Sequence, residues 1–288
     1  MSIKRVVPLN QINGVAAGAT ATINLPVGPR QYHAIVIGYK TATAGGATEA
    51  TIGSEITEVR MNIDGVTQRR FSPAQLFNLN RQKGKVLTAS ASVAIPGYLT
   101  LFLSEPQRKT DFERELTAWG MKGVGSFQIE IDIASGAASP VVNGYAVIDD
   151  QNLPPAGIIK WKRETIQVSA TGDLTYKMDT NKGDSYQSAT FIETTAGDIG
   201  ALELTWDGVP LYKDDENVAV ELLNMSDFTR VAKYRHVPLN RNVLGDMVPS
   251  VKKDANGNLI KVGEFIAKLT MDVAANVTLI REVAGSPD

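Results

Sequence analysis

Two stretches of the chain alternate apolar and polar residues and then run into Asp-Gly-Val. Residues 59–66 read Val-Arg-Met-Asn-Ile-Asp-Gly-Val, and residues 202–209 read Leu-Glu-Leu-Thr-Trp-Asp-Gly-Val. A period of two predicts a β-strand with one buried face. Asp-Gly between strands predicts a type I′ turn, because both central residues need positive φ. We therefore expect two hairpins, whose turns are formed by Asp64, Gly65, Asp207 and Gly208.

The residue before each turn is predicted to face a hydrophobic core. Ile63 and Trp206 hold this position in the two hairpins, each opposite a valine across the turn. A third core anchor is predicted at Trp119, because apolar side chains recur before it with the i, i+4, i+7 spacing of one helix face. The pattern therefore predicts a helix over 110–119 that buries Trp119.

The order of elements indicates an internal duplication. The two hairpins lie close to half the chain apart, and a second alternating stretch at 129–134 has its counterpart at 269–274. A short helical pattern follows each hairpin: one opens at Ser72-Pro73, and the other at the acidic run 214–216. Two Asp-Gly hairpins alone could be coincidence, since this turn is common. The matching order of three features favours duplication.

Short strands separated by turns dominate the rest of the chain. With 25 glycines, 13 prolines and 43% hydrophobic residues in 288, the composition favours an all-β protein with substantial cores. We predict two tandem jelly-roll β-barrels with a few short helices, residues 1–150 and 151–288, joined by the acidic, proline-stiffened stretch 149–155. Residues 41–54 are interpreted as a flexible loop, and 237–261 as irregular chain with a type I′ turn at Asn256-Gly257.

Charge and composition exclude several classes of function. Lys and Arg total 29 against 31 Asp and Glu, a net charge of −2, so there is no basic field for nucleic acid and no direct nucleic-acid contact is expected. The absence of cysteine excludes disulfides, thiolate metal sites and cysteine nucleophiles. No apolar run approaches the ~18 residues of a membrane span, and the N-terminus lacks the pattern of a secretory signal. We expect synthesis in the cytoplasm.

No motif for catalysis is found. The two histidines, His33 and His236, occur in unlike contexts, whereas a duplicated cupin needs clustered histidine ligands; both are interpreted as strand-edge residues. There is no nucleophile elbow, phosphate-cradling loop or zinc helix. Asp64 and Asp207 are explained as turn residues rather than paired catalytic carboxylates. We therefore expect no catalytic residues, no cofactor and no enzymatic activity.

Two clusters of charge leave alternatives open. The acids at 214–216 could bind calcium, but a helix N-terminus explains them equally, and the stretch 254–258 lacks the later glutamate of an EF-hand. The metal set therefore stays unknown. A basic cluster lies beside two phenylalanines, a pattern found at nucleic-acid surfaces, although the acidic overall charge favours a solvated face or a subunit contact; the cluster is Arg69, Arg70, Arg81, Lys83 and Lys85.

Several of these stretches resemble one viral family. The opening residues 10–28, the hairpin 59–65 and the run 111–133 are similar to the corticovirus major capsid protein, and the second half is similar mainly through 202–208. The resemblance implies a double jelly-roll coat subunit of a tailless icosahedral bacteriophage with an internal membrane. It also implies a virion location, an association of calcium with the particle, and no catalytic residues to carry over.

The same resemblance implies the partners. Three subunits would form a capsomer, and two similar barrels per chain would then give a pseudo-hexagonal tile of six. Neighbouring capsomers, the penton and minor membrane proteins of the virion are the further expected partners, with the N-terminal arm, residues 1–13, contacting the membrane surface. The alternative is a two-domain carbohydrate-binding or adhesin module, since jelly rolls serve lectins too. A jelly-roll hydrolase lacks a visible acid–base set.

Overall fold

A computed structural model describes residues 3–9, 12–85, 92–106, 110, 114–179, 183–215, 218, 220, 221, 223, 228–239 and 247–288. The chain divides into two compact units. Unit 1 comprises Met1–Ile159 with Ser286–Asp288, and unit 2 comprises Lys160–Gly285. The stretch 149–155 belongs by its contacts to unit 1, where Lys122 N donates to Leu153 O.

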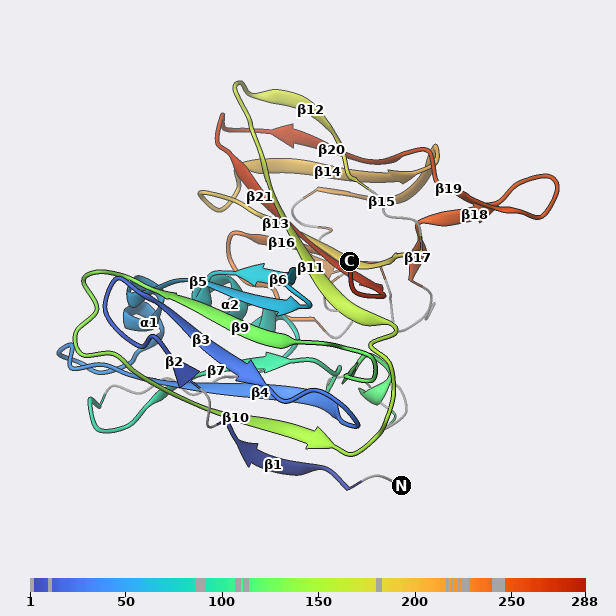
Figure 1. The fold of residues 1–288 in the computed structure, drawn as a ribbon. Coiled ribbons are helices and arrows are strands. Elements are labelled where there is room, and N and C mark those ends of the chain that lie inside the picture. Colours follow the sequence, from blue (N-terminus) through green and yellow to red (C-terminus); the bar gives the residue numbers. More distant parts are fainter. Residues whose placement is uncertain are drawn as a thin grey trace. The chain divides into compact units, whose positions relative to one another are not determined.

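Unit 1 consists of two antiparallel sheets packed face to face (Figure 1). The first has the order β1-β10-β4-β7, with the two-residue β8 on the end of β4. The second has the order β6-β5-β9-β3-β2. The strands are β1 (Arg5–Pro8), β2 (Ile12–Asn13), β3 (Thr20–Leu25), β4 (Gln31–Lys40), β5 (Ile56–Ile63), β6 (Val66–Phe71), β7 (Gly97–Phe102), β8 (Trp119–Gly120), β9 (Phe127–Ile133) and β10 (Val141–Asp149).

The core of unit 1 follows from strand alternation. Every second residue of β9 is buried and the residues between them are half-exposed, which is the pattern of a sheet with one face in the core. The same alternation in β3 and β7 directs apolar side chains between the two sheets. The fully buried side chains there include Ile23, Ile35, Ile37, Met61, Leu99, Leu101, Ile129 and Ile131.

Two helices flank the hairpin β5–β6 in sequence. Helix α2 (Pro73–Gln82) begins at Ser72 with a full capping box, in which Ser72 Oγ accepts from Gln75 N and the Gln75 side chain accepts from Ser72 N; the helix predicted after the first hairpin is confirmed. Helix α1 (Glu49–Glu55), capped by Thr48, occupies residues interpreted as a flexible loop. That interpretation is wrong for residues 49–54, which are helical and bury Ile52, whereas residues 41–48 contain no helix or strand.

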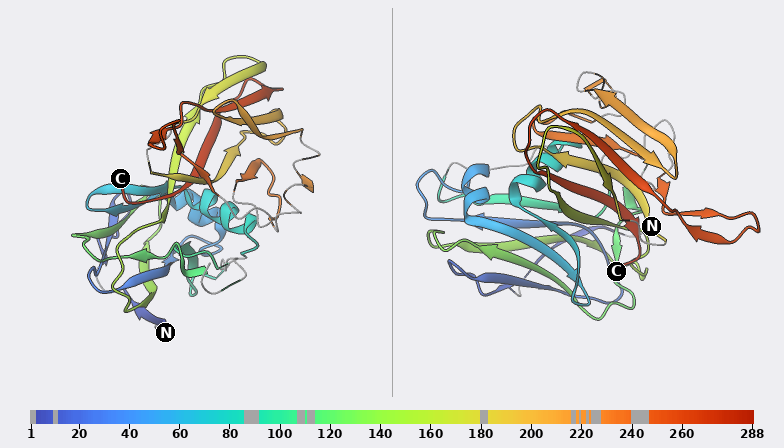
Figure 2. Two further views of the ribbon diagram at one scale, coloured as in Figure 1. Left: turned by 90° about the vertical axis from the view of Figure 1, so that its right-hand side faces the viewer. Right: turned by 90° about the horizontal axis from the view of Figure 1, so that it is seen from above.

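Unit 2 also has two antiparallel sheets, visible separately in Figure 2. Their orders are β16-β13-β21-β11 and β12-β20-β14-β15. The strands are β11 (Ile158–Ile166), β12 (Gly172–Lys177), β13 (Ser185–Ile192), β14 (Ile199–Trp206), β15 (Val209–Asp215), β16 (Tyr234–Pro238), β17 (Val248–Pro249), β18 (Val251–Lys253), β19 (Leu259–Lys261), β20 (Phe265–Met271) and β21 (Val277–Gly285). The short pair β18–β19 forms a hairpin of its own.

The two units repeat one topology. If the minor strands β2, β8 and β17–β19 are set aside, the described residues of each unit form eight strands in chain order. In both, one sheet contains the first, eighth, third and sixth of them, and the other contains the fifth, fourth, seventh and second. This is the jelly-roll arrangement, in two open facing sheets rather than a closed barrel. The hairpins β5–β6 and β14–β15 are strands four and five of each unit, so the duplication predicted from the sequence is confirmed.

The backbone angles confirm two of the three predicted type I′ turns and contradict the third. Asp64 and Gly65 have φ values of 49° and 80°, and Asp207 and Gly208 have 50° and 81°, the left-handed pair that a type I′ turn requires. Asn256 does not share this geometry, since only Gly257 has positive φ there. The type I′ turn predicted at Asn256-Gly257 is therefore wrong; Asp254 Oδ1 instead accepts from the backbone N–H groups of a wider loop.

The helix predictions near Trp119 and Asp214 are confirmed in part, but the predicted extent of each helix is wrong. Arg114 and Glu115 are helical, and Arg114 N donates to Thr110 O at the predicted start of the helix; residues 111–113 lie outside the described part of the chain. The helix ends before Trp119, which lies in β8 opposite Tyr32 of β4, and Leu116 is 58% exposed. Asp214 and Asp215 end strand β15 rather than opening a helix, while Val218 and Leu223 farther on are helical. In both places strand pairing takes over part of the segment whose pattern is helical, and the helix is confined to the residues that remain.

Candidate functional site

The three expected core anchors differ in burial. Ile63 and Trp119 are buried, at 2% and 0% exposure. Trp206 is half-buried: its ring packs on the margin of the unit 2 core and its indole Nε1 donates to Pro249 O at 2.9 Å. Trp206 is therefore a boundary residue rather than the centre of the core, because it stands at the last position of its strand.

An aromatic and arginine cluster surrounds Trp119. The Trp119 and Phe127 ring centroids lie 5.5 Å apart, and Tyr32 meets Phe127 edge-on at 5.3 Å. The Arg69 guanidinium lies 5.2 Å from the Trp119 ring centroid, a cation–π distance. Arg69 is buried, and it donates from Nε to Ile159 O and from Nη1 to Phe102 O, both at 2.7 Å. The cluster therefore ties together chain segments far apart in sequence.

The basic residues that cluster in the sequence do not share one surface in the fold. Arg69 points into unit 1, so the prediction of a solvated face is wrong for it, while Arg70 is exposed and Arg81 is paired with Glu49 at 2.9 Å. Nothing in the sequence marked Arg69 out from its neighbours, because strand alternation at a bulge between β5 and β6 decides which side chain turns inward.

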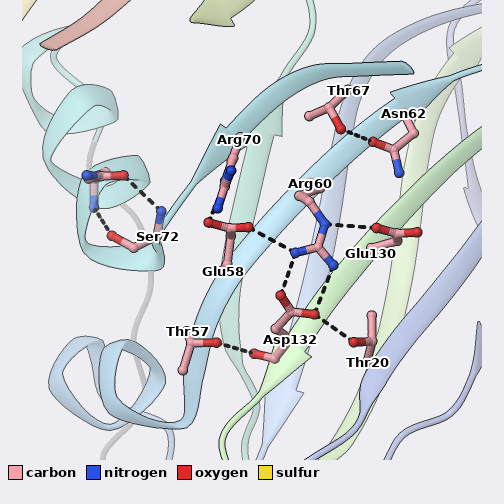
Figure 3. A network of polar contacts seen from close by, with 11 residues as sticks. Thr20, Thr57, Glu58, Arg60, Asn62, Thr67, Arg70, Ser72, Glu130 and Asp132 are labelled. Atoms are coloured by element: carbon pink, nitrogen blue, oxygen red, sulfur yellow. Dashed lines mark hydrogen bonds and ion pairs between the residues drawn. The ribbon is translucent and has the colours of Figure 1, made fainter. Parts of the chain in front are cut away.

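The outer face of the β5–β9 sheet carries a charged network, shown in Figure 3. Arg60 lies at its centre: Nε binds Glu130 at 2.8 Å, Nη1 binds Asp132 at 2.5 Å and Glu58 at 2.9 Å, and Nη2 binds Asp132 at 3.0 Å. Arg70 binds the second oxygen of Glu58 at 2.7 Å. Strand pairing of Arg60 with Glu130 and of Glu58 with Asp132 places these groups side by side.

Hydrogen bonding in this network stabilises the ionised carboxylates. The bidentate bond from Arg60 lowers the pKa of Asp132, and Thr20 Oγ1 adds a bond at 2.7 Å. Partial burial by itself would raise the pKa of Glu58, but hydrogen bonds from Arg70 and Arg60 outweigh it and the pKa is lowered. This face of unit 1 is therefore polar, paired and compatible with water.

A buried carboxylate, Glu55, organises the end of α1. It accepts hydrogen bonds from Tyr39 Oη at 2.7 Å, from Thr41 Oγ1 at 3.0 Å and from Thr43 Oγ1. Burial favours the neutral acid, but these donors outweigh it, so the pKa of Glu55 is lowered. Desolvation and the neighbouring carboxylate raise the pKa of Tyr39. The cluster anchors α1 to β4, and each group in it has a structural use.

The histidines and remaining acids are likewise engaged. His33 is buried in β4, between β10 and β7, with Nε2 3.0 Å from Asp149 Oδ2, so the strand-edge interpretation is wrong for it. His236 lies in unit 2 on β16, where Nδ1 is 2.8 Å from Thr190 Oγ1. Asp214, considered as a calcium ligand, is buried and paired with Arg235 at 2.9 Å.

The turn aspartates have structural partners. Asp64 Oδ1 accepts from Gly125 N at 2.9 Å and Ser126 N at 2.7 Å, and Asp207 is paired with Lys252. Within the described residues there is no group of three or more histidine and acidic side chains that could hold a metal ion. No helix in that part of the chain is long and apolar enough to cross a membrane.

Comparison with known proteins places the chain in a family. The sequence model described as "Viral coat protein P2 N-terminal domain" matches residues 6–149, half of the chain. The chain belongs to this viral coat protein family. The resemblance to a phage major capsid protein is thereby confirmed, and the subunit is a structural component of a virion coat. Among curated proteins no match was found.

Solved structures extend the likeness over both units of this coat protein. The major capsid protein P2 from Bacteriophage PM2 is similar with a TM-score of 0.80 and 19% identity over 98% of this chain and 97% of that one. The STIV MCP follows with 0.65 and 12% over 99% and 97%, and the PBCV-1 virus capsid with 0.63 and 10% over 98% and 93%. At such identities the likeness establishes the fold, and it confirms two jelly rolls in one chain. The family match is what decides against a carbohydrate-binding module.

Proposed function

We propose that this coat protein assembles as a homotrimer, and that six jelly rolls from three chains form one pseudo-hexagonal tile of an icosahedral shell. The observation that supports the proposal is the repeated eight-strand order in units 1 and 2. Two similar domains in each of three subunits supply six similar edges around a threefold axis, so hexagonal packing needs no sixfold symmetry. One of the similar structures is described as that of the Sulfolobus Turreted Icosahedral Virus.

The role is structural rather than enzymatic in this proposal. The charged groups that a catalytic site would need are used for folding: His33 with Asp149, Asp214 with Arg235, and Glu55 with three hydroxyls. Neighbouring capsomers, a penton protein, minor membrane proteins and a membrane beneath the shell complete the proposed setting. Calcium association stays a prediction.

Part of the expected N-terminal arm is a strand. Arg5–Pro8 pairs as β1 with β10, and Ile12–Asn13 pairs as β2 with β3. A membrane or intersubunit role for residues 1–13 would therefore fall to the start of the chain and to the exposed side of β1.

Light scattering of the purified protein tests the oligomer. Three subunits of 31.0 kDa give 93 kDa, and we expect that mass with or without reductant, because the chain has no cysteine. Negative-stain images should then show threefold particles. A mass of 31.0 kDa across micromolar concentrations, with no particles on the grid, would contradict the trimer.

A further inference from the structure

The two outer faces of unit 1 differ in chemistry. The β5–β9 face carries the paired network of Arg60 and its neighbours. The opposite outer face, that of the sheet β1-β10-β4-β7, is apolar at most positions. We call it the β10 face. Its exposed large apolar side chains are Val6 at 67%, Val141 at 53% and Tyr145 at 42%.

Strand register places these residues in continuous rows. Across β1, β10, β4 and β7, one row contains four apolar side chains, Val6, Val147, Ala34 and Phe102. The next row is Pro8, Tyr145, Val36 and Thr100. Tyr98 and Val141 extend the face along the sheet, beside Asn143 and Lys40. The rows contain no acidic residue, and Lys40 is their one formal charge.

Continuous rows of apolar side chains are energetically unfavourable on a surface that stays in contact with water. A β-strand with one wet face normally alternates apolar and polar residues, as β9 does with Gln128, Glu130 and Asp132. Strand β10 instead places valine or tyrosine at three of its four outward positions, Val141, Tyr145 and Val147. Contiguous exposed apolar patches on soluble proteins mark interaction sites. The β10 face is therefore built to be covered.

We propose that a second copy of this chain covers the β10 face in the assembled coat. The inference rests on the proposed function, since a coat subunit meets copies of itself. Interface centres are depleted in charge and enriched in aromatic residues, which describes this face, with Tyr98, Phe102 and Tyr145. A face that binds an anionic membrane would need several basic side chains, and the rows contain only Lys40.

The size of the face fits a stable contact. The four strands have 4, 9, 10 and 6 residues; with strands about 4.8 Å apart and a rise of about 3.3 Å per residue, they cover roughly 460 Å² in projection. A standard interface buries about 800 Å² of accessible surface on each partner, and a corrugated sheet exposes more accessible area than its projection. One such face is thus enough for one subunit contact.

Single-cysteine labelling tests the proposal directly, because the natural chain has no cysteine. Tyr145→Cys reports on the β10 face, and Val66→Cys, on β6 of the other sheet, is the matched control, since both native side chains are 42% exposed. In the assembled protein we expect maleimide to modify Tyr145→Cys at least tenfold more slowly than Val66→Cys. Equal rates in assembled protein would overturn the inference while leaving the trimer intact.

A charge substitution gives a second, independent measurement. V141K/Y145K adds two lysines to the β10 face, and N13K/V66K adds two at exposed positions of β2 and β6 in the other sheet of unit 1. We expect the first variant to lose the assembled mass in light scattering while its circular dichroism stays native, and the second to keep it. Full assembly of V141K/Y145K would refute the inference. Protection of Tyr145→Cys only on addition of lipid vesicles would also refute it, in favour of a membrane as the occupant. A wild-type monomer would instead refute the proposed function.

Discussion

Replacement of Trp119 by alanine should severely destabilise unit 1. The side chain is fully buried, packs against Phe127 and lies beneath the Arg69 guanidinium. Truncation of a buried tryptophan typically costs about 3–5 kcal/mol through lost burial and the cavity that remains. Loss of the cation–π contact adds roughly 1–2 kcal/mol, because Arg69 is desolvated. We expect a loss of about 5 kcal/mol in the free energy of unfolding.

Calorimetry is the direct assay. A unit of this size shifts its melting temperature by roughly 2–4 °C per kcal/mol, so the unit 1 transition should fall by about 10–20 °C. Trp119→Phe keeps an aromatic ring against Phe127 and removes a buried indole N–H that has no hydrogen-bond acceptor among the described residues. That variant should lose only about 1–2 kcal/mol.

Trp206→Ala is the matched comparison in unit 2. Its ring is half-buried and its Nε1 donates to Pro249 O, so a loss of about 1–2 kcal/mol is expected from one hydrogen bond and partial burial. The reasoning would be refuted if Trp206→Ala destabilised the protein more than Trp119→Ala, or if Trp119→Ala lost less than about 1 kcal/mol.

Three further predictions concern the turns and the polar clusters. Gly208→Val should destabilise the β14–β15 hairpin by roughly 1–3 kcal/mol, because a β-branched residue is strained at φ 81°. Steric crowding adds nothing, since no atom lies within 4 Å of the position that the valine Cβ would take. A melting temperature equal to that of the wild type would contradict this. The lowered pKa of Glu55 adds stability above its unfolded pKa of about 4.3, and that stability is lost as the pH falls through the lower folded value. The free energy of unfolding of Glu55→Gln should therefore decline less steeply below about pH 4.3 than that of the wild type. Equal slopes for the two proteins would contradict a stabilising role of the Glu55 cluster. Arg60→Met should lower the free energy of unfolding, measured in urea, by about 1–2 kcal/mol, because Glu58, Glu130 and Asp132 lose their common partner. Arg70→Met, at an exposed site, should change it by less than about 0.5 kcal/mol. Similar losses for both variants would contradict the central role of Arg60 in the network.

Local chemistry explains which features were predictable from the sequence. Each Asp-Gly turn depends on two residues that tolerate positive φ, and α2 depends on Ser72, Pro73 and Gln75 within one turn of helix. The duplication was visible because strands four and seven of each unit keep the same period of two and an Asp-Gly turn follows strand four in both. These signals need no partner from elsewhere in the chain, so the sequence alone carries them.

Other features depended on distant partners. The predicted helix stops short of Trp119, because Tyr32 supplies a strand partner for this residue and Phe127 an aromatic one. Arg69 became a buried residue only because carbonyl groups of Phe102 and Ile159 converge on its guanidinium. No local pattern encodes such convergence, since it arises from the packing of segments that are far apart in sequence.

The two outer faces of unit 1 show most clearly which features the local sequence decides and which features strand pairing decides. The alternation of β9 and β10 by itself determined that each strand has an inner and an outer side. Which outer side is charged and which is apolar was decided by register, which aligns Arg60 with Glu130 on one sheet and Val6 with Val147 on the other. Strand pairing converts single residues into rows, and a continuous row is what another protein surface can bind.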